Sequence, residues 1–316
     1  MTATAPPGPP GTAPAPGDWR LGEQLLNRAA ERLLDPQGRA LAAQVQWWAL
    51  PGDEDPDRRW PLAVLGQGPP LLLLHGFDSS FLEYRRLAPL LAEHHQLLIP
   101  DLHGFGFTPR PLQRRYDPEA LLQHLESVLQ AAHDRFGPEP LGLIGASMGS
   151  AVAVALARRQ PSRIRCLLLL APAGLSGSPR PLPAPLDRLG TWFLSRPAVR
   201  RGLCRSAFAE PDRDVGPAEL EIASAHLETP GWDFALRGFA RSGGFAGCGL
   251  PLPTQPLRAL WGAADRILPA DQKQQTRALL GERLQELPAC GHLPHIDQPR
   301  AVAALWHSWM GRPAED

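Results

Sequence analysis

The sequence has little or none of several features that define whole classes of protein. It has a single lysine, Lys273, and its 32 basic residues balance 32 acidic ones. A formal charge of zero gives no whole-protein electrostatic reason to expect binding to nucleic acid or to an acidic membrane. No apolar run approaches the roughly 18 residues that cross a bilayer, so we expect no integral membrane segment. Oligomeric state is left open by these observations.

Cysteine is also scarce. The four cysteines, Cys166, Cys204, Cys248 and Cys290, are too few for a disulfide framework in 316 residues, and no CxxC pair suggests zinc. We expect free thiols and no metal, and leave open whether Cys204 pairs with Cys248. The N-terminus lacks the charged and apolar regions of a secretion signal, which makes the cytoplasm the expected location.

The first part of the chain changes character twice. Residues 1–17 are rich in Pro, Gly and Ala and are predicted to form a disordered tail. Residues 18–35 then space their apolar residues as a half-buried helix does. From residue 71, short runs that are apolar throughout alternate with segments predicted to be helical, at 80–93, 118–136, 147–160, 271–280 and 298–310. This alternation predicts an α/β fold with a doubly wound, mostly parallel sheet covered on both faces.

One long segment interrupts the alternation. Residues 175–256 contain no clear buried strand, begin Pro-rich, and continue as helical pieces with many aromatic residues. A loop of this length is rare in a compact domain unless it has a function. We therefore predict a helical cap at 175–256 above the carboxyl ends of the strands, inserted between two parts of the core at 18–174 and 257–312. Its candidate pocket residues are Trp192, Phe193, Trp232 and Phe239.

The pentapeptide GASMG, residues 145–149, lies between a predicted strand and a predicted helix. It does not match the G-x-G-x-x-G of a dinucleotide fold, and the Lys of a P-loop is absent, so we expect no cofactor. The pattern G-x-S-x-G is instead typical of a nucleophile elbow, in which Ser147 lies at the tip of a sharp turn.

A serine hydroxyl attacks only when a base removes its proton, and a carboxylate must hold that base in the right tautomer. Two later strand ends supply both groups. Asp265 follows the run LRALWG, and His292 lies in the loop before the last helix. The chain order serine, aspartate, histidine is the order expected when G-x-S-x-G is the elbow of a hydrolase.

Five segments together resemble the capped branch of the α/β-hydrolase superfamily: LLLLHGF, DLHGFGFT, GASMG, WGAADRILP and GHLPHIDQP. The resemblance covers residues 71–310 and implies an eight-stranded sheet. It also implies transfer of an acyl group to Ser147, with His292 as base and then acid and Asp265 as its orienting partner. The backbone N–H groups of Phe77 and Met148 would form the oxyanion hole.

The expected reaction is hydrolysis of an ester, thioester or lactone of an apolar small molecule. Three alternatives stay open: a cofactor-free perhydrolase or haloperoxidase, a hydrolase of carbon–carbon bonds, and a ligand-binding or receptor-like protein with little turnover. Hydrolases of ring-cleavage products often have a Gly-Pro-Gly-like run after the His-Gly, where this chain has FDSSF, and this difference weighs against that alternative. Asp78 within that run is expected to cap the following helix.

Overall fold

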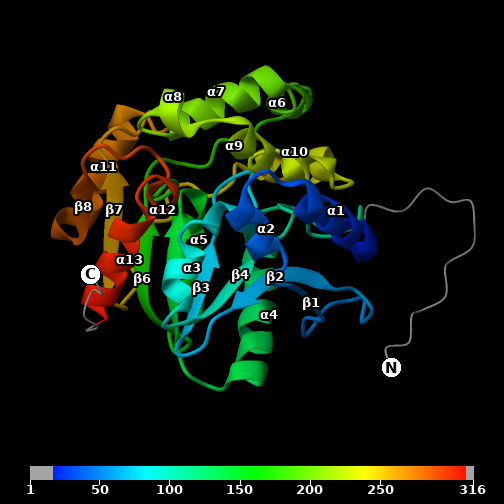
Figure 1. The fold of residues 1–316 in the computed structure, drawn as a ribbon, viewed down its shortest axis with the longest axis horizontal. Helices are drawn as coiled ribbons and strands as arrows, with labels where there is room; N and C mark the ends of the chain where they lie inside the picture. The colour runs from blue at the N-terminus through cyan, green and yellow to red at the C-terminus, as the bar shows by residue number, and fades with distance from the viewer. Residues whose placement is uncertain (1–16, 311–316) are drawn as a thin grey trace, which may run out of the picture.

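A computed structural model describes residues 17–310, so all of the predicted tail except Gly17 lies outside the described residues. A central sheet of eight strands runs through the molecule (Figure 1). The strands are β1 (Val45–Trp48), β2 (Trp60–Leu65), β3 (Pro70–Leu74), β4 (Gln96–Pro100), β5 (Leu141–Ala146), β6 (Ile164–Leu170), β7 (Leu257–Gly262) and β8 (Leu284–Leu287).

The sheet is mostly parallel, as predicted. Its spatial order is β1-β2-β4-β3-β5-β6-β7-β8. The hairpin β1–β2 and the pair β2–β4 are antiparallel, and every other neighbouring pair is parallel. The carboxyl ends of the six parallel strands from β4 to β8 therefore meet at one edge, which is where ligands bind in sheets of this kind.

Strand β3 shows why its residues are apolar without interruption. Successive side chains of a strand point to opposite faces, and here both faces are covered. Leu71 and Leu73 join a buried cluster with Trp306 on one side of the sheet. Leu72 and Leu74 join a second buried cluster on the other side. The same division holds along β6, so the sheet lies between two separate hydrophobic cores.

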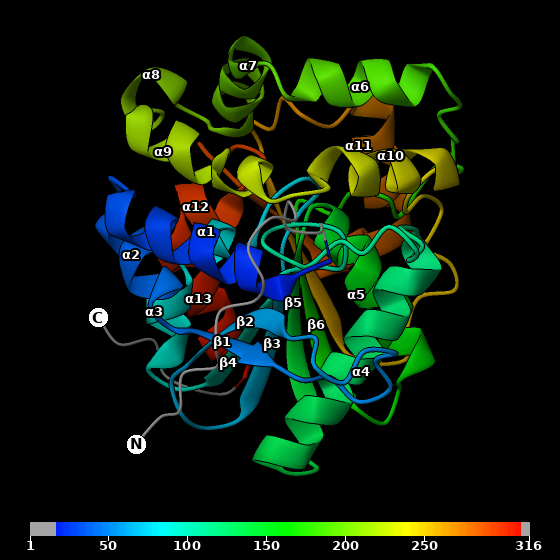
Figure 2. The same ribbon diagram turned by 90° about the vertical axis from the view of Figure 1, so that its right-hand side faces the viewer.

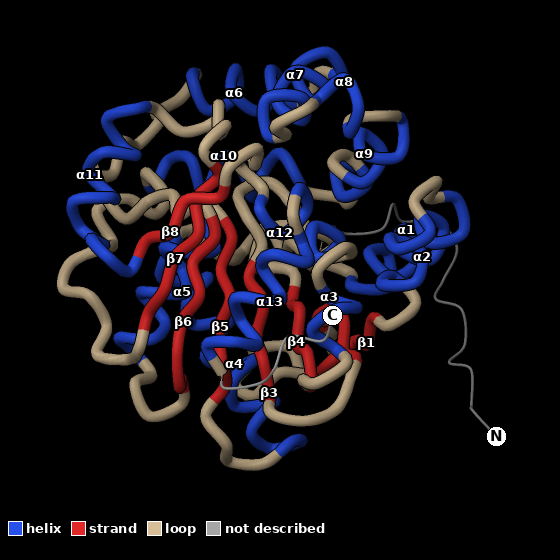
Figure 3. Tube along the Cα trace, turned by 60° about the vertical axis from the view of Figure 1, so that its left-hand side comes forward, coloured by secondary structure: helices blue, strands red, loops and turns tan. Residues whose placement is uncertain are grey.

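Helices cover both faces (Figures 2 and 3). Outside residues 175–256, the helical elements are α1 (Trp19–Arg32), α2 (Pro36–Ala42), η1 (Phe81–Tyr84), α3 (Ala88–Ala92), α4 (Pro118–Phe136), α5 (Met148–Arg159), α11 (Ala270–Leu280), η3 (Gly281–Arg283), α12 (Pro294–Asp297) and α13 (Pro299–Trp309). The bounds of α4 follow from local chemistry. Asp117 accepts a hydrogen bond from the N–H of Ala120, Pro118 occupies the first turn, and Gly137 ends the helix with φ 96°.

Two helical predictions need correction. The helix expected over residues 80–93 is split into η1 and α3, because Pro89 cannot donate to an earlier carbonyl and so fits only in a first turn. The short helix α2 was not predicted. Its start signal is present in the sequence: Asp35 accepts hydrogen bonds from the N–H groups of Gln37 and Gly38, with Pro36 in the first turn.

Residues 175–256, called the insertion from here on, form a layer of helices above the carboxyl edge of the sheet (Figures 1 and 2). Its elements are α6 (Leu186–Leu194), α7 (Pro197–Ala207), α8 (Pro211–Asp214), α9 (Pro217–Ile222), η2 (Ala225–Glu228) and α10 (Trp232–Ser242). Buried ion pairs fasten it to the core: Glu219 of α9 accepts from Arg85 and Arg86, and Arg85 also pairs with Asp35.

Two further sequence expectations concern cysteines and membranes. All four cysteines are free thiols, so Cys204 and Cys248 do not pair. Within residues 17–310, no helix is long and apolar enough to cross a membrane.

The connection from β5 into α5 packs closely against its neighbours. A methyl group on Gly145 would lie 2.3 Å from the carbonyl oxygen of Gly149. A methyl group on Gly149 would lie 2.2 Å from the carbonyl oxygen of Leu74 in β3. Both obstacles are backbone atoms, which cannot rotate away as a side chain does. Glycine at these two positions is therefore a steric requirement of the turn that carries Ser147.

We expect the substitution Gly149→Ala to lower the free energy of unfolding by about 3 kcal/mol, because overpacking against backbone forces the helix off the sheet. Gly202 in α7 is a matched control, since a methyl group there meets nothing within 4 Å. Gly202→Ala should stabilise the chain by about 0.5–1 kcal/mol through its better helix propensity. Urea unfolding measures both, and a wild-type midpoint for Gly149→Ala would contradict the steric argument.

Candidate active site

Ser147 lies between β5 and α5 in a backbone conformation that side chains rarely adopt. Its φ and ψ angles are 51° and −119°, and such a conformation persists only where the surroundings hold it. Here the neighbouring strand β6 does so. The N–H of Ser147 donates to the carbonyl of Leu170 at 2.8 Å, and its carbonyl accepts from the N–H of Ala173 at 3.1 Å. The turn thus presents the hydroxyl at the carboxyl edge of the sheet.

The three predicted residues come together in one chain of hydrogen bonds. The Oγ of Ser147 lies 2.8 Å from Nε2 of His292, and Nδ1 of His292 lies 3.0 Å from Oδ2 of Asp265. A carboxylate can only accept, so Nδ1 carries the proton and Nε2 is left to accept from the serine hydroxyl. This is the arrangement in which a serine can transfer its proton while it attacks.

Asp265 is held on both of its oxygens. Oδ2 also accepts from the indole N–H of Trp261 at 2.9 Å, and Oδ1 accepts from the N–H of Ile267 at 2.7 Å. Burial opposes ionisation of Asp265, but these hydrogen bonds and its contact with His292 outweigh it and lower the pKa of the carboxyl. The carboxylate therefore stays charged at neutral pH in a fixed orientation.

His292 is positioned by both the core and the insertion. It lies in the loop between β8 and α12, and its backbone N–H donates to the carbonyl of Ala207, the last residue of α7, at 2.7 Å. The preceding Gly291 fits against the same carbonyl, since a methyl group there would lie 2.3 Å from that oxygen. The location of the imidazole thus depends on where the insertion lies.

The two predicted oxyanion donors lie beside Ser147. Met148 begins α5, and the first N–H groups of a helix have no partner within it. Phe77 follows Gly76, where a methyl group would lie 3.3 Å from the Cβ of Ser147. The turn after β3 and the start of α5 therefore both lie beside Ser147, and their role as an oxyanion hole stays a prediction.

A cavity of about 250 Å³ opens at Ser147 and His292. Its lining comes from the core and from α6 and α7 of the insertion, and most of it is apolar. The apolar lining residues are Phe77, Leu194, Leu203, Ala207, Ala223, Ile267 and Leu293, and the ionisable ones besides His292 are Asp78, Glu83, Arg200 and Cys204.

Asp78 does not cap the following helix, which corrects the prediction. Its carboxylate instead joins three residues of the insertion. Oδ2 accepts from Arg200 of α7 at 2.5 Å, and Oδ1 accepts from the indole N–H of Trp232 at 2.8 Å and lies 3.1 Å from Nε2 of His226. Burial opposes ionisation of Asp78, but His226, Arg200 and Trp232 lower the pKa of its carboxyl. No local pattern in the sequence indicates this network, because Asp78 is more than 100 residues away from Arg200, His226 and Trp232.

The four predicted pocket residues are not part of the cavity lining. Trp192 and Phe193 lie on the outside of α6, with 52% and 53% of their surface exposed, which corrects the prediction for both. Trp232 lies one step behind the cavity, where it holds Asp78. Phe239 packs behind Phe77, with ring centroids 6.1 Å apart.

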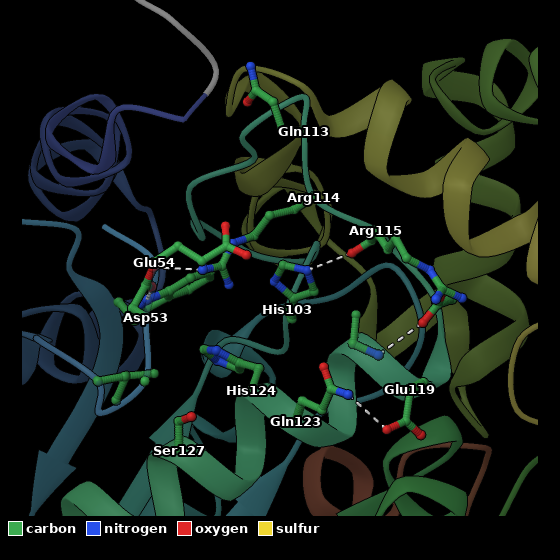
Figure 4. A pocket seen from close by; sticks show the side chains of 15 residues that line it. Asp53, Glu54, His103, Gln113, Arg114, Arg115, Glu119, Gln123, His124 and Ser127 are labelled. Atoms are coloured by element: carbon green, nitrogen blue, oxygen red, sulfur yellow. Dashed lines mark hydrogen bonds and ion pairs between the residues drawn. The ribbon is translucent and has the colours of Figure 1, made fainter. Parts of the chain in front are cut away.

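Two other histidines lie apart from the catalytic candidates. His295, three residues after His292, is buried and its Nε2 lies 2.9 Å from Oε1 of Glu83. His103 lines a separate cavity of about 370 Å³ beside α4, where its Nε2 lies 2.9 Å from the carbonyl of Arg115 (Figure 4). Burial lowers the pKa of His103 to about 4. His103 is thus neither at the surface nor at Ser147.

Residues 71–305 match the sequence profile described as the alpha/beta hydrolase family. The chain belongs to the alpha/beta hydrolase family. A 2-hydroxy-6-oxo-2,4-heptadienoate hydrolase of Pseudomonas putida is 29% identical over 266 residues, which cover 80% of this chain and 92% of that protein. The alpha/beta hydrolase domain-containing protein VTE7 of Arabidopsis thaliana is 27% identical, with 89% and 88% of the two chains covered.

Solved structures of other alpha/beta hydrolases share the fold. The meta-cleavage product hydrolase CumD of Pseudomonas fluorescens superposes with a TM-score of 0.68 at 18% identity, covering 85% of this chain and 98% of that one. The predicted superfamily and the eight-stranded fold are confirmed by these comparisons. This chain is therefore an alpha/beta hydrolase enzyme.

We expect Asp265→Asn to slow the labelling of Ser147 by a fluorophosphonate by on the order of 10³–10⁴-fold, because the amide allows the wrong tautomer of His292. Asp271→Asn is the matched control, since Asp271 is exposed in the first turn of α11. The rate of labelling is followed by intact-protein mass spectrometry. Labelling of Asp265→Asn at the wild-type rate would contradict the role of this carboxylate.

We expect Asp78→Ala to lower the free energy of unfolding by about 3–5 kcal/mol, because it leaves the buried charge of Arg200 without its partner. Arg200→Met in the same chain should recover part of the loss, since no uncompensated charge then remains. Asp212→Ala is the control: it breaks an exposed pair with Arg205 and should leave the urea midpoint unchanged. Equal effects of Asp78→Ala and Asp212→Ala would refute the buried-pair account.

Proposed function

We propose that this chain is a serine hydrolase that cleaves a carbon–carbon bond next to a carbonyl group. Ser147 is the proposed nucleophile, His292 the base and acid, and Asp265 the orienting acid. The observation that carries the proposal is the assembled contact of 2.8 Å between Oγ of Ser147 and Nε2 of His292. The choice of bond is supported by relatives named 2-hydroxy-6-oxo-2,4-heptadienoate hydrolase and 2-hydroxymuconate semialdehyde hydrolase.

The proposed reaction begins when Oγ of Ser147 attacks the carbonyl carbon while His292 takes its proton. The N–H groups of Phe77 and Met148 stabilise the resulting oxyanion. The carbon–carbon bond then breaks, and the imidazolium of His292 donates its proton to the carbon that leaves. Water, activated by His292, finally hydrolyses the acyl-serine and releases a carboxylic acid.

We further propose that the insertion acts as a cap. Its helices α6 and α7 supply part of the cavity lining, and the N–H of His292 is bonded to the end of α7. A cap in this place excludes water from the acyl-serine until the first product has left. Under this proposal, the cap also sets the shape of the substrate that fits.

A second candidate is hydrolysis of an ester of an apolar small molecule. The observation that favours it is the charge balance of the cavity. Among the described residues that line it, the one guanidinium is Arg200, and Asp78 already offsets its charge. A dienoate carries a carboxylate that needs a cation, whereas an apolar ester does not.

The experiment that tests the proposal offers both kinds of substrate to the wild type and to Ser147→Ala. One is 2-hydroxy-6-oxo-2,4-heptadienoate, which with one water yields acetate and 2-hydroxypenta-2,4-dienoate. The other is a series of p-nitrophenyl esters of increasing chain length. Chromatography follows the acids that are released, and the kcat/KM values for the two classes are compared.

We expect the wild type to release acetate from the dienoate with a higher kcat/KM than for any ester, and Ser147→Ala to release none above the uncatalysed rate. Turnover of the esters alone would replace the first proposal with the second. Absence of turnover of both, together with no labelling by a fluorophosphonate, would overturn both.

A further inference from the structure

Helix α6 has polar residues on its buried face and apolar residues on its exposed face, which is the reverse of an ordinary surface helix. Its buried residues are Asp187 and Thr191, which are polar. Its outer face carries Leu186, Leu189, Trp192 and Phe193, which are 49%, 58%, 52% and 53% exposed. Most helices of globular proteins turn their apolar side chains inward. Four large apolar side chains that point outward from one short helix indicate a surface that contacts something else.

The same surface has an excess of positive charge. Residues 180–209 contain six arginines and a single acid, Asp187, in a chain whose formal charge is zero. Asp187 is paired with Arg241, and two of the arginines are paired outside the segment with Asp78 and Asp212.

The remaining four arginines of the segment, Arg180, Arg188, Arg196 and Arg201, are exposed. The guanidinium of Arg196 lies 4.1 Å from the ring centroid of Trp192. Arg196 therefore lies on the same face as Trp192, and the other three exposed arginines belong to the same segment of the insertion.

The place of this face in the molecule adds a third observation. Helices α6 and α7 form the outermost layer, at the end of the molecule away from the lower ends of the strands (Figures 1 and 2). Leu203 of α7 is 42% exposed and also lines the cavity of Ser147. The outer face is thus continuous with the wall of the cavity.

The positive charge of this face distinguishes between two possible binding partners, a second copy of the chain and a lipid surface. A two-fold contact between two copies places a patch against itself, so the exposed arginines of one copy would meet those of the other. A lipid surface with anionic headgroups has the opposite charge. It also accepts Leu and Phe below the headgroups and Trp and Arg at their level, which is the composition of this face.

We propose that the outer face of α6 and α7 docks on a membrane surface that contains anionic lipid. Leu186, Leu189, Trp192 and Phe193 enter the headgroup region, and the exposed arginines pair with lipid phosphates. Docking in this orientation brings the wall of the cavity at Leu203 close to the lipid. The proposal does not depend on which bond the enzyme cleaves.

The test is sedimentation of the full chain with vesicles, either of phosphatidylcholine alone or of equal parts phosphatidylcholine and phosphatidylglycerol. We expect wild type to sediment with the anionic vesicles, to be released by high salt, and to stay in solution with the neutral ones. Trp192→Ala with Phe193→Ala should weaken the vesicle affinity about tenfold or more. Replacing Arg188, Arg196 and Arg201 by Gln should weaken it on the order of 100-fold.

Matched control variants change equally exposed residues elsewhere. Leu112→Ala with Leu250→Ala removes two apolar side chains that are 54% and 70% exposed, and Arg283→Gln with Arg300→Gln removes two exposed charges. Both should bind as wild type does. Fluorophosphonate labelling of Ser147 checks that every variant is folded, and vesicle binding itself needs no turnover, so it is judged separately from the proposed reaction.

Two results would overturn the docking proposal. In the first, wild type stays in solution with the anionic vesicles, or the control variants lose as much affinity as the α6 variants. In the second, wild type forms a dimer in analytical ultracentrifugation that Trp192→Ala with Phe193→Ala abolishes, while vesicle binding is absent. That second result would assign the face to another copy of the chain.

Discussion

Helix α5 approaches strand β3 so closely that a methyl group on Gly149 would lie 2.2 Å from the carbonyl oxygen of Leu74. This close backbone approach sets the geometry of everything around Ser147. It forces a sharp turn, in which Ser147 takes a positive φ that strand β6 stabilises through hydrogen bonds to its backbone. It also puts the start of α5 beside the turn that contains Gly76 and Phe77.

The other half of the site depends on the insertion. The N–H of His292 is bonded to the end of α7, and the residue next to Phe77, Asp78, is bonded to α7, η2 and α10. A shift of these helices would therefore move His292 and the turn that contains Phe77 together. In the interior, a charge such as that of Asp78 is tolerable only while its partners remain in place. The same helices that contact the site carry an apolar outer face with exposed arginines, which is the face we propose to dock on a membrane.

Much of the fold was predictable, for identifiable reasons. Strands such as β3 are apolar on both faces, which distinguishes them from amphipathic helices, and helices such as α4 have a capping Asp at one end and Gly at the other.

Two predictions from the sequence were wrong for physical reasons that can be named. The helix expected over 80–93 is two shorter helices, because Pro89 fits only in the first turn of a helix. The spacing of apolar residues alone does not take this effect of proline into account. The sequence predicts Trp192 and Phe193 in the pocket because a small cap must also cover the site, but helical periodicity does not show which face of α6 is buried.

The sequence by itself determined the order and identity of Ser147, Asp265 and His292, since each follows an apolar strand and the carboxyl ends of parallel strands share one edge. It also determined the glycines that allow the turn at Ser147. The tertiary structure alone decided how Asp78 is used and which way α6 faces. The use of Asp78 depends on contacts with residues more than 100 positions away, and the direction of α6 depends on its packing against α7 and α10. The local pattern of residues around Asp78 or Trp192 is the same whichever partner the fold brings to them.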